Sequence, residues 1–247
     1  MNYTFIGDIH GCIEELELLY QEYLDSEIKR GHHLIFLGDI VDRGPESIKC
    51  IEFIYSLMKN YKNIFCLRGN HEDWYIRFNH HEKKHETLGI KNPMGNIDVE
   101  RIQIAKEIRN NYTDWIESLP LYLKFPNLIA IHAGIPSIVN NYKDLSNKKF
   151  SSRVMRLRMI DEKGKMVELA KEQPHHIHWS AKYNGRFGHA IFGHSANFEI
   201  FSQKNSTGID TACCYGGNLT AFTFNDKGEK INYHQVKAFR KYSESFV

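Results

Sequence analysis

The sequence predicts an α/β fold with a substantially parallel sheet. In the first half of the chain, short runs rich in β-branched and aromatic residues alternate with stretches of helical periodicity. A Gly-Asp or Gly-Asn pair stands at or just after the end of each of the first three runs. Such alternation is typical of parallel strands that are joined by helices.

The predicted elements of the first half follow in chain order. We expect strands at residues 3–7, 33–38 and 63–68. Residues 13–24 should form a helix, because their apolar side chains recur on one helical face. Pro45 is suited to open a second helix, and a third is expected after His71.

The second half predicts an inserted helical cap and a β-rich end. Between residues 78 and 120, apolar side chains from Val99 to Trp115 recur at helical spacing. Strands are expected at 128–134, 190–194, 208–211, 219–224 and 231–236, whereas the charged segment 140–174 shows weak periodicity. Because the sequence contains no repeat, low-complexity stretch or linker, we predict one domain over residues 1–247.

Composition limits the partners and the compartment. The 32 Lys and Arg residues nearly balance the 30 Asp and Glu residues, so net charge does not indicate nucleic-acid or membrane binding. Five cysteines without a CxxC pair favour a reducing compartment. A strand is predicted almost from the first residue, and no apolar stretch reaches the ~18 residues that span a bilayer. These features predict a cytoplasmic protein.

Five short motifs follow predicted strands and contain metal-ligand residue types. They are GDIHG (7–11), GDIVDRG (38–44), RGNHE (68–72), HAG (132–134) and GHS (193–195). Each motif alone is compatible with a turn, a helix cap or a structural histidine, but five in order after strands are not readily explained by chance. Side chains at the carboxyl ends of sheet strands meet in one crevice. The predicted ligands of divalent metal are Asp8, His10, Asp39, Asn70, His132 and His194.

The spacing of these residues predicts two metal ions that share one ligand. Asp8 and His10 are two residues apart, so both can face the same side on leaving an extended strand. Asp39 ends the second strand, between the two ligand sets, and is the expected bridging carboxylate. The first metal would bind Asp8, His10 and Asp39, and the second would bind Asp39, Asn70, His132 and His194.

The motifs together resemble the signature blocks of the phosphoprotein-phosphatase branch of the calcineurin-like metallophosphoesterases. The tail IDTACCYGGNLTAF (209–222) is similar to the closing block of that branch, so the resemblance covers nearly the whole chain. The segment 178–195 most resembles bacterial symmetrical diadenosine-tetraphosphatases and the phosphatase module of bacterial polynucleotide kinase–phosphatases. The resemblance implies a four-layer α/β/β/α sandwich of two mixed sheets, with metal ions at the strand ends.

Hydrolysis by a metal-bridging hydroxide is the expected chemistry, since two divalent cations acidify a shared water enough to attack phosphorus near neutral pH. His71 would protonate the leaving oxygen, and Asp42 would orient the His71 imidazole. Arg43 and Arg68 would bind the non-bridging oxygens together with Asn70, although Arg68 could instead form a surface salt bridge. Asp210 could orient the site from behind the ligands or be an ordinary turn residue.

One stretch departs from the branch pattern. Ser/Thr protein phosphatases of this branch usually carry a further phosphate-binding Arg shortly before the last His motif, whereas this chain has Trp-Ser-Ala-Lys at 179–182. Arg153, Arg156 or Arg158 could substitute. We expect three other groups to have no catalytic or metal-binding role. The histidines at 175, 176 and 178 should be surface or structural residues, and the cysteines at 213 and 214 should be buried thiols. The basic segment 148–171 should be a solvated face, which could also attract a polyanionic substrate.

Several functions remain open from the sequence. A Ser/Thr protein phosphatase-like phosphomonoesterase comes first, and a symmetrical dinucleoside-polyphosphate (diadenosine tetraphosphate) hydrolase is the alternative. A phosphodiesterase acting on nucleic-acid ends and a non-catalytic scaffold are less favoured, the latter because all six ligands and His71 are present. The partner is expected to be a phosphorylated protein or a nucleotide. The ligand set suits Mn²⁺ first, with Fe or Zn²⁺ as alternatives.

Overall fold

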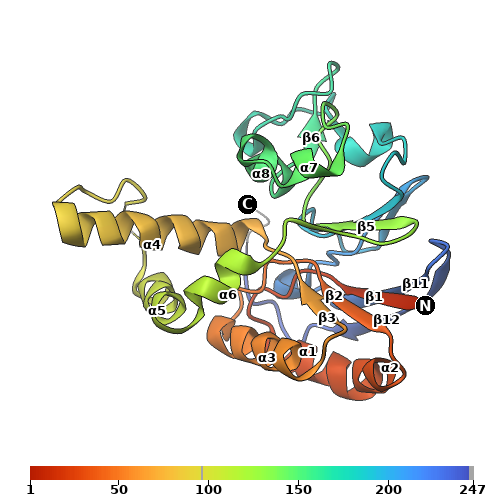
Figure 1. Cartoon of the computed structure of the whole chain (residues 1–247), viewed down its shortest axis with the longest axis horizontal. Coiled ribbons are helices and arrows are strands. Elements are labelled where there is room, and N and C mark those ends of the chain that lie inside the picture. The colour runs from red at the N-terminus through yellow and green to blue at the C-terminus, as the bar shows by residue number, and fades with distance from the viewer. Residues whose placement is uncertain (96, 245–247) are drawn as a thin grey trace.

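Two mixed five-stranded sheets form the centre of the computed structural model, which describes residues 1–95 and 97–244 (Figure 1). The first sheet has the order β12-β11-β1-β2-β3. Its strands β1, β2 and β3 are parallel, and the C-terminal hairpin β11–β12 adds antiparallel strands beside β1. The bounds are β1 Asn2–Ile6, β2 His33–Phe36, β3 Ile64–Cys66, β11 Asn218–Asn225 and β12 Lys230–Lys237.

The second sheet has the order β4-β5-β8-β10-β9. Strands β5, β8 and β10 are parallel, and β4 and β9 pair antiparallel at the edges. The strand expected at 208–211 is wrong in position, because β10 ends at Gly208 and residues 209–211 leave the sheet toward the strand-end loops. The bounds are β4 Tyr122–Lys124, β5 Leu128–Ile131, β8 His189–Phe192, β9 Phe201–Gln203 and β10 Ser206–Gly208.

Buried strands with two apolar faces place the two sheets between helical layers. In β2, Ile35 packs between the sheets, whereas its neighbours Leu34 and Phe36 face the helices. In β5, Leu128 packs between the sheets and Ile129 faces the opposite, outer layer. Because successive strand residues point to opposite faces, apolar residues at both parities bury both faces of a strand. The result is the four-layer sandwich that the family resemblance implies.

Helices α1, α2 and α3 cover the outer face of the first sheet (Figure 1). Helix α1 (Ile13–Leu19) continues through a π-helical turn, Tyr20–Leu24, into α2 (Asp25–Lys29). The predicted apolar face is confirmed, since Leu16, Leu19 and Leu24 are fully buried. Helix α3 (Ser47–Asn60) begins two residues after Pro45.

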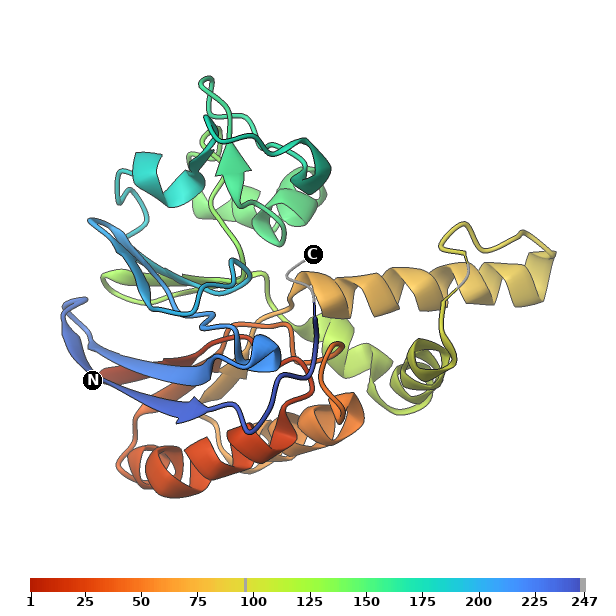
Figure 2. The same cartoon turned by 180° about the vertical axis from the view of Figure 1, so that it is seen from behind.

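A helical segment extends sideways from the sandwich (Figures 1 and 2). It comprises α4 (Asn70–Leu88), α5 (Val99–Glu107), a π-helical turn at Ile108–Tyr112 and α6 (Thr113–Ser118). Ala105 and Ile108 are buried as the periodicity predicts, but Val99 lies outside that face and is 71% exposed. This segment corresponds to the inserted helices expected at 78–120.

Arg101 of α5 connects this segment to the sandwich. Its Nη2 donates to Asp42 Oδ2 at 2.8 Å and its Nε donates to Asp42 Oδ1 at 3.2 Å. The guanidinium also lies 4.0 Å from the centre of the Trp74 ring. Two-pronged hydrogen bonding to a buried carboxylate fixes both distance and orientation.

A lobe inserted between β5 and β8 lies over the second sheet (Figure 2). It contains α7 (Tyr142–Leu145), α8 (Lys148–Val154) and the two-stranded sheet β6 (Met159–Ile160) and β7 (Ile177–His178). Phe150, Val154 and Trp179 belong to the apolar cluster that joins the lobe to β5 and β8. The charged segment without clear periodicity therefore folds as a packed lobe.

No helix in the described ranges combines the length and apolar character that crossing a bilayer requires.

We predict that Arg101→Ala lowers the free energy of unfolding by about 1–3 kcal/mol, since the variant removes two hydrogen bonds to a buried carboxylate. Urea denaturation measures the loss. Arg109→Ala is the matched control, because Arg109 pairs with Glu86 on the surface of the same segment and should cost less than about 1 kcal/mol. Equal losses in the two variants would contradict an anchoring role for Arg101.

Candidate functional site

Five strands of the two sheets deliver the predicted ligands to one edge of the sandwich. In the first sheet, Ile6 lies beside Phe36 and Phe36 beside Cys66, so the segments that lead to Asp8, Asp39 and Asn70 start at a common level. In the second sheet Ile131 lies beside Phe192, just before His132 and His194. Parallel pairing thus brings together ligands that lie up to 186 residues apart in the chain.

The backbone around this edge adopts left-handed conformations that are unusual for residues with a side chain. His10, Asp39 and His194 have φ of 48°, 50° and 63°. Asp42, Arg43 and Ala212 share the feature, with φ between 61° and 70°. Such conformations carry strain and persist only where surrounding contacts hold them, as at functional sites.

Two groups of potential metal ligands share Asp39. His10, Asp39 and His71 form one group, and Asp39, His132 and His194 form the other. Within each group the ligand atoms lie within 4.8 Å of one another. The Asp39 Oδ2 atom lies 3.7 Å from His10 Nε2 and 3.3 Å from His132 Nε2. This places Asp39 where the sequence predicts a bridging carboxylate.

Asn70 and Asp8 complete the predicted set. Asn70 Oδ1 lies 3.1 Å from His132 Nε2, beside the second group. Asp8 Oδ2 accepts a hydrogen bond from the His194 backbone N–H, whereas the buried Asp8 Oδ1 has no hydrogen-bond partner. A buried carboxylate oxygen without a partner is costly unless a cation neutralises it. The residues present therefore fit divalent cations at this edge.

Two glycines leave the carboxylates room. A side-chain carbon on Gly193 would stand 1.9 Å from Asp8 Oδ1, and one on Gly69 would stand 2.2 Å from Asp39 Oδ1. Neither position tolerates a larger residue without displacing a ligand oxygen.

The carboxylates of Asp8, Asp39 and Asp210 are buried close enough to affect one another's pKa. Burial, together with the Asp210 and Asp39 carboxylates, raises the pKa of Asp8 well above its usual range. Burial and Asp39 also raise the pKa of Asp210 to about 6. Burial opposes ionisation of Asp39 as well, but the His132 and His71 imidazoles outweigh it and lower its pKa well below the ordinary value. Divalent cations would relieve this repulsion between carboxylates.

Backbone carbonyls orient two of the imidazoles. His10 Nδ1 lies 2.8 Å from the Val41 carbonyl oxygen, and His132 Nδ1 lies 2.8 Å from that of Leu37. With Nδ1–H donating to the backbone, Nε2 is left as the ligand atom and faces Asp39.

Glu72 is a supporting residue that the sequence reasoning missed. Its buried carboxylate accepts hydrogen bonds from the backbone N–H groups of Gly69, Asp39 and Ile40 at 2.8–2.9 Å. Glu72 thereby holds the second and third ligand loops together. The only signal in the sequence was its position as the last residue of RGNHE.

His71 and Asp42 form a hydrogen-bonded pair next to the ligands. His71 Nδ1 lies 2.5 Å from Asp42 Oδ2, and Tyr75 and Arg101 also donate to Asp42. Burial alone would lower the pKa of His71, but the Asp39 and Asp42 carboxylates raise it overall. Burial raises the pKa of Asp42, but the hydrogen bond and charge of His71 outweigh burial and lower this pKa to about 2. The pair can therefore hold a proton on His71.

The site opens into a cleft of about 310 Å³, a volume within the range of small-molecule sites. Donor residues from both ligand groups line it, together with Arg43, Arg156 and Arg158. Arg43 Nη1 donates to the Tyr215 hydroxyl. Arg68 is not among the described lining residues; its backbone N–H donates to the Pro120 carbonyl oxygen. None of the described residues of segment 78–120 lines this cleft.

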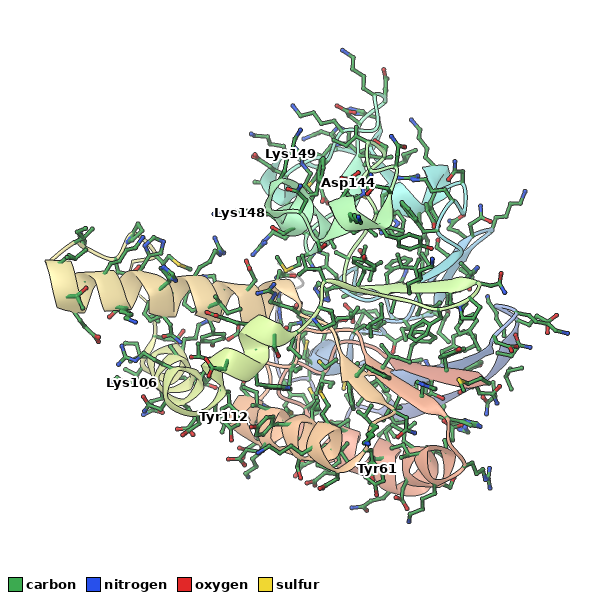
Figure 3. All side chains as sticks on the ribbon, viewed as in Figure 1. Tyr61, Lys106, Tyr112, Asp144, Lys148 and Lys149 are labelled. Atoms are coloured by element: carbon green, nitrogen blue, oxygen red, sulfur yellow. The ribbon has the colours of Figure 1, made fainter. Side chains whose placement is uncertain are left out.

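Other residues noted in the sequence lie apart from the ligand groups. His178 is held between Ser180 Oγ at 2.7 Å and Ser195 Oγ at 3.1 Å, and burial lowers its pKa to about 4. Cys213 and Cys214 are buried, and their thiol pKa values are raised. Lys148 and Lys149 are exposed on the lobe (Figure 3).

We predict that Asp8→Asn weakens metal binding while it stabilises the chelator-treated protein, since it removes a ligand and one of the repelling carboxylates. In thermal unfolding at pH 8, Mn²⁺ at a hundredfold excess over its Kd should stabilise the unsubstituted protein by about 2.7 kcal/mol. Asp8→Asn should gain much less. Asp226→Asn, a surface control, should respond like the unsubstituted protein. An equal Mn²⁺ response in Asp8→Asn would rule out Asp8 as a ligand.

Comparison with known proteins agrees with this site. The family model described as calcineurin-like phosphoesterase matches residues 1–198. Asymmetrical bis(5′-nucleosyl)-tetraphosphatase PrpE of Oceanobacillus iheyensis is 34% identical over 241 residues, covering 92% of this chain and 90% of the relative. The protein of the same name from Anoxybacillus flavithermus is 31% identical over 232 residues, covering 91% of each chain.

Solved structures share the fold. A crystal structure of a candidate diadenosine tetraphosphatase has a TM-score of 0.72 at 22% identity and covers 96% of this chain and 94% of its own. A Ser/Thr phosphatase from Saccharomyces cerevisiae has a TM-score of 0.61 at 17% identity, covering 97% and 81%. With the family model matching most of the chain, the protein belongs to the calcineurin-like phosphoesterase family and is a metal-dependent hydrolase of phosphate esters.

Proposed function

We propose that this protein binds two divalent cations and hydrolyses dinucleoside tetraphosphates, cutting the phosphate chain asymmetrically. The observation that carries the proposal is the pair of ligand groups that share Asp39 and open into one cleft lined by three arginines. The names of the relatives support the substrate class. These names specify asymmetrical cleavage, whereas the resemblance of segment 178–195 implied symmetrical cleavage.

Two divalent cations held by the six ligands would supply Lewis acidity and an activated water. Mixed carboxylate, imidazole and amide ligation suits Mn²⁺, with Fe or Zn²⁺ as alternatives. The five cysteines are free and buried, which is consistent with a cytoplasmic location.

The protein's own side chains would bind the substrate and transfer a proton. Arg43, at the cleft wall, is positioned to bind non-bridging phosphoryl oxygens. His71 donates its Nε2 proton to the leaving oxygen, while Asp42 at Nδ1 keeps the ring in orientation. Arg68 remains a predicted phosphate ligand, although it is not among the described residues that line the cleft.

A phosphomonoesterase acting on phosphoserine or phosphothreonine is the second candidate, favoured by the motif resemblance. The substrate panel that separates the two contains diadenosine tetraphosphate, a phosphoserine peptide and a bis-aryl phosphodiester, each with Mn²⁺. We expect kcat/KM to be about a hundredfold higher for the tetraphosphate, which corresponds to about 2.7 kcal/mol of differential transition-state binding. A reversed preference would establish the phosphomonoesterase.

The products test the site of cleavage. Asymmetrical cleavage of diadenosine tetraphosphate gives ATP and AMP, whereas symmetrical cleavage gives two ADP. Chromatography of an early time point distinguishes these pairs, and formation of ADP alone would return the assignment to the symmetrical type.

We predict that the effect of His71→Asn depends on the leaving group. A serine alkoxide needs a proton to leave, whereas p-nitrophenolate and nucleotide phosphates leave more readily as anions. The variant should therefore lose about 100- to 10,000-fold in kcat on the phosphoserine peptide and much less on p-nitrophenyl phosphate. His176→Asn, a histidine outside the ligand groups, is the control. Equal losses on both substrates would contradict the role of His71 as general acid.

A further inference from the structure

The lobe inserted between β5 and β8 forms one wall of the cleft. None of the six predicted metal ligands lies in the segment that forms this wall. The ligands come from strand-end loops of the sandwich, whereas the wall comes from Arg156 to Glu172. The lobe packs on β5 and β8 through its own apolar cluster. Because the lobe lines the cleft beside the predicted metal ligands, it is in position to contact the part of the substrate that does not react.

The lobe presents two guanidinium groups in succession. Leu157 is buried, while Arg156, in the turn that follows α8, and Arg158, just before β6, line the cleft on either side of it. Arg156 lies nearer the ligands, since its Nη2 is 3.5 Å from the Asn70 carbonyl oxygen and 3.3 Å from Asp73 Oδ2. Arg158 Nη2 is held by Glu172 Oε1 at 3.4 Å. Each guanidinium has five N–H donors, so these contacts leave donors for phosphate oxygens.

Beyond the arginines the wall combines apolar side chains with two carboxylates, Glu168 and Glu172, which are paired with Lys171 and Arg158. Met166, Val167 and Leu169 line the same cleft. The Val167 N–H donates to the Met159 carbonyl oxygen, which fixes this stretch beside the strand that follows Arg158. Leu169 is 45% exposed, although it belongs to a folded turn, Leu169–Lys171. An inorganic phosphate or a short phosphate ester would not cover these side chains.

We propose that this wall is the subsite for the non-reacting end of a nucleoside polyphosphate. In this assignment, which rests on the proposed function, Arg156 takes the place of the phosphate-binding Arg absent from segment 179–182. Arg158 binds the next phosphate of the chain, and the apolar side chains of Met166, Val167 and Leu169 pack against the nucleoside. Guanidinium groups and apolar side chains that line one cleft fit a ligand that joins phosphates to a nucleoside.

The first test uses the unsubstituted protein with Mn²⁺ and p-nitrophenyl phosphate as the reporter substrate. Competitive inhibition is compared for inorganic phosphate, ribose 5-phosphate, AMP, ADP and ATP. The subsite predicts that ADP inhibits at least tenfold more tightly than phosphate and more tightly than ribose 5-phosphate. Equal inhibition by phosphate and ADP would overturn it. This test needs no tetraphosphate turnover, so it stays decisive even if the proposed function fails.

The second test measures selectivity in variants of the wall. The readout is the ratio of kcat/KM on diadenosine tetraphosphate to kcat/KM on p-nitrophenyl phosphate. We expect Leu169→Ser to lower this ratio about three- to tenfold and Arg158→Gln to lower it about ten- to a hundredfold, mainly through KM on the tetraphosphate. If the protein does not hydrolyse the tetraphosphate, the inhibition constant of ADP relative to phosphate replaces the ratio.

Two variants of the same lobe provide matched controls. Ile138→Ser removes an apolar side chain that is 58% exposed and does not line the cleft. Lys149→Gln removes an exposed positive charge and so separates direct contact from general attraction of anions by the lobe (Figure 3). Both should keep the ratio of the unsubstituted protein. An unchanged ratio in Leu169→Ser and Arg158→Gln, or the same fall in the controls, would overturn the subsite.

Discussion

The placement of the Asp39 carboxylate is the constraint on which the rest of the site depends. Asp39 belongs to both ligand groups, because its Oδ2 atom faces imidazoles that come from different sheets. Its backbone takes a left-handed conformation to do so, and its N–H is held by Glu72. The two sheets must therefore pack in one relative position, which the apolar layer between them provides.

Strand order and glycine placement serve that constraint. Parallel pairing puts the ends of β1, β2 and β3 at one edge, and β5 and β8 meet them from the second sheet. Gly69 and Gly193 leave the space next to Asp39 and Asp8 in which carboxylate oxygens can approach. The cost is a set of buried, mutually repelling carboxylates, and in metalloenzymes of this kind the bound cations offset such repulsion.

The proposed chemistry and the proposed selectivity fall on different parts of the chain. The strand ends of the sandwich supply Asp42 and the candidate ligands other than Asn70, and the first turn of α4 supplies Asn70 and His71. Arg101 joins the helical segment to Asp42, so the orientation of the His71 imidazole depends on an element outside the sandwich. The lobe supplies the cleft wall. In the proposed function, this separation would let the lobe vary with the substrate while the metal site stays the same.

The sequence alone determined the α/β class and pointed to six candidate ligand residues that the structure brings to one edge, because short motifs after apolar runs depend on local chain geometry and pleat alternation. It also predicted the pairing of His71 with Asp42, and in the structure His71 Nδ1 lies 2.5 Å from Asp42 Oδ2. Only the tertiary structure decided that Glu72 links two ligand loops, that Arg101 reaches Asp42 and that Arg156 and Arg158, rather than Arg68, line the cleft. These contacts join residues that are mostly tens of positions apart in the chain, and periodicity carries no information about which distant surfaces will meet.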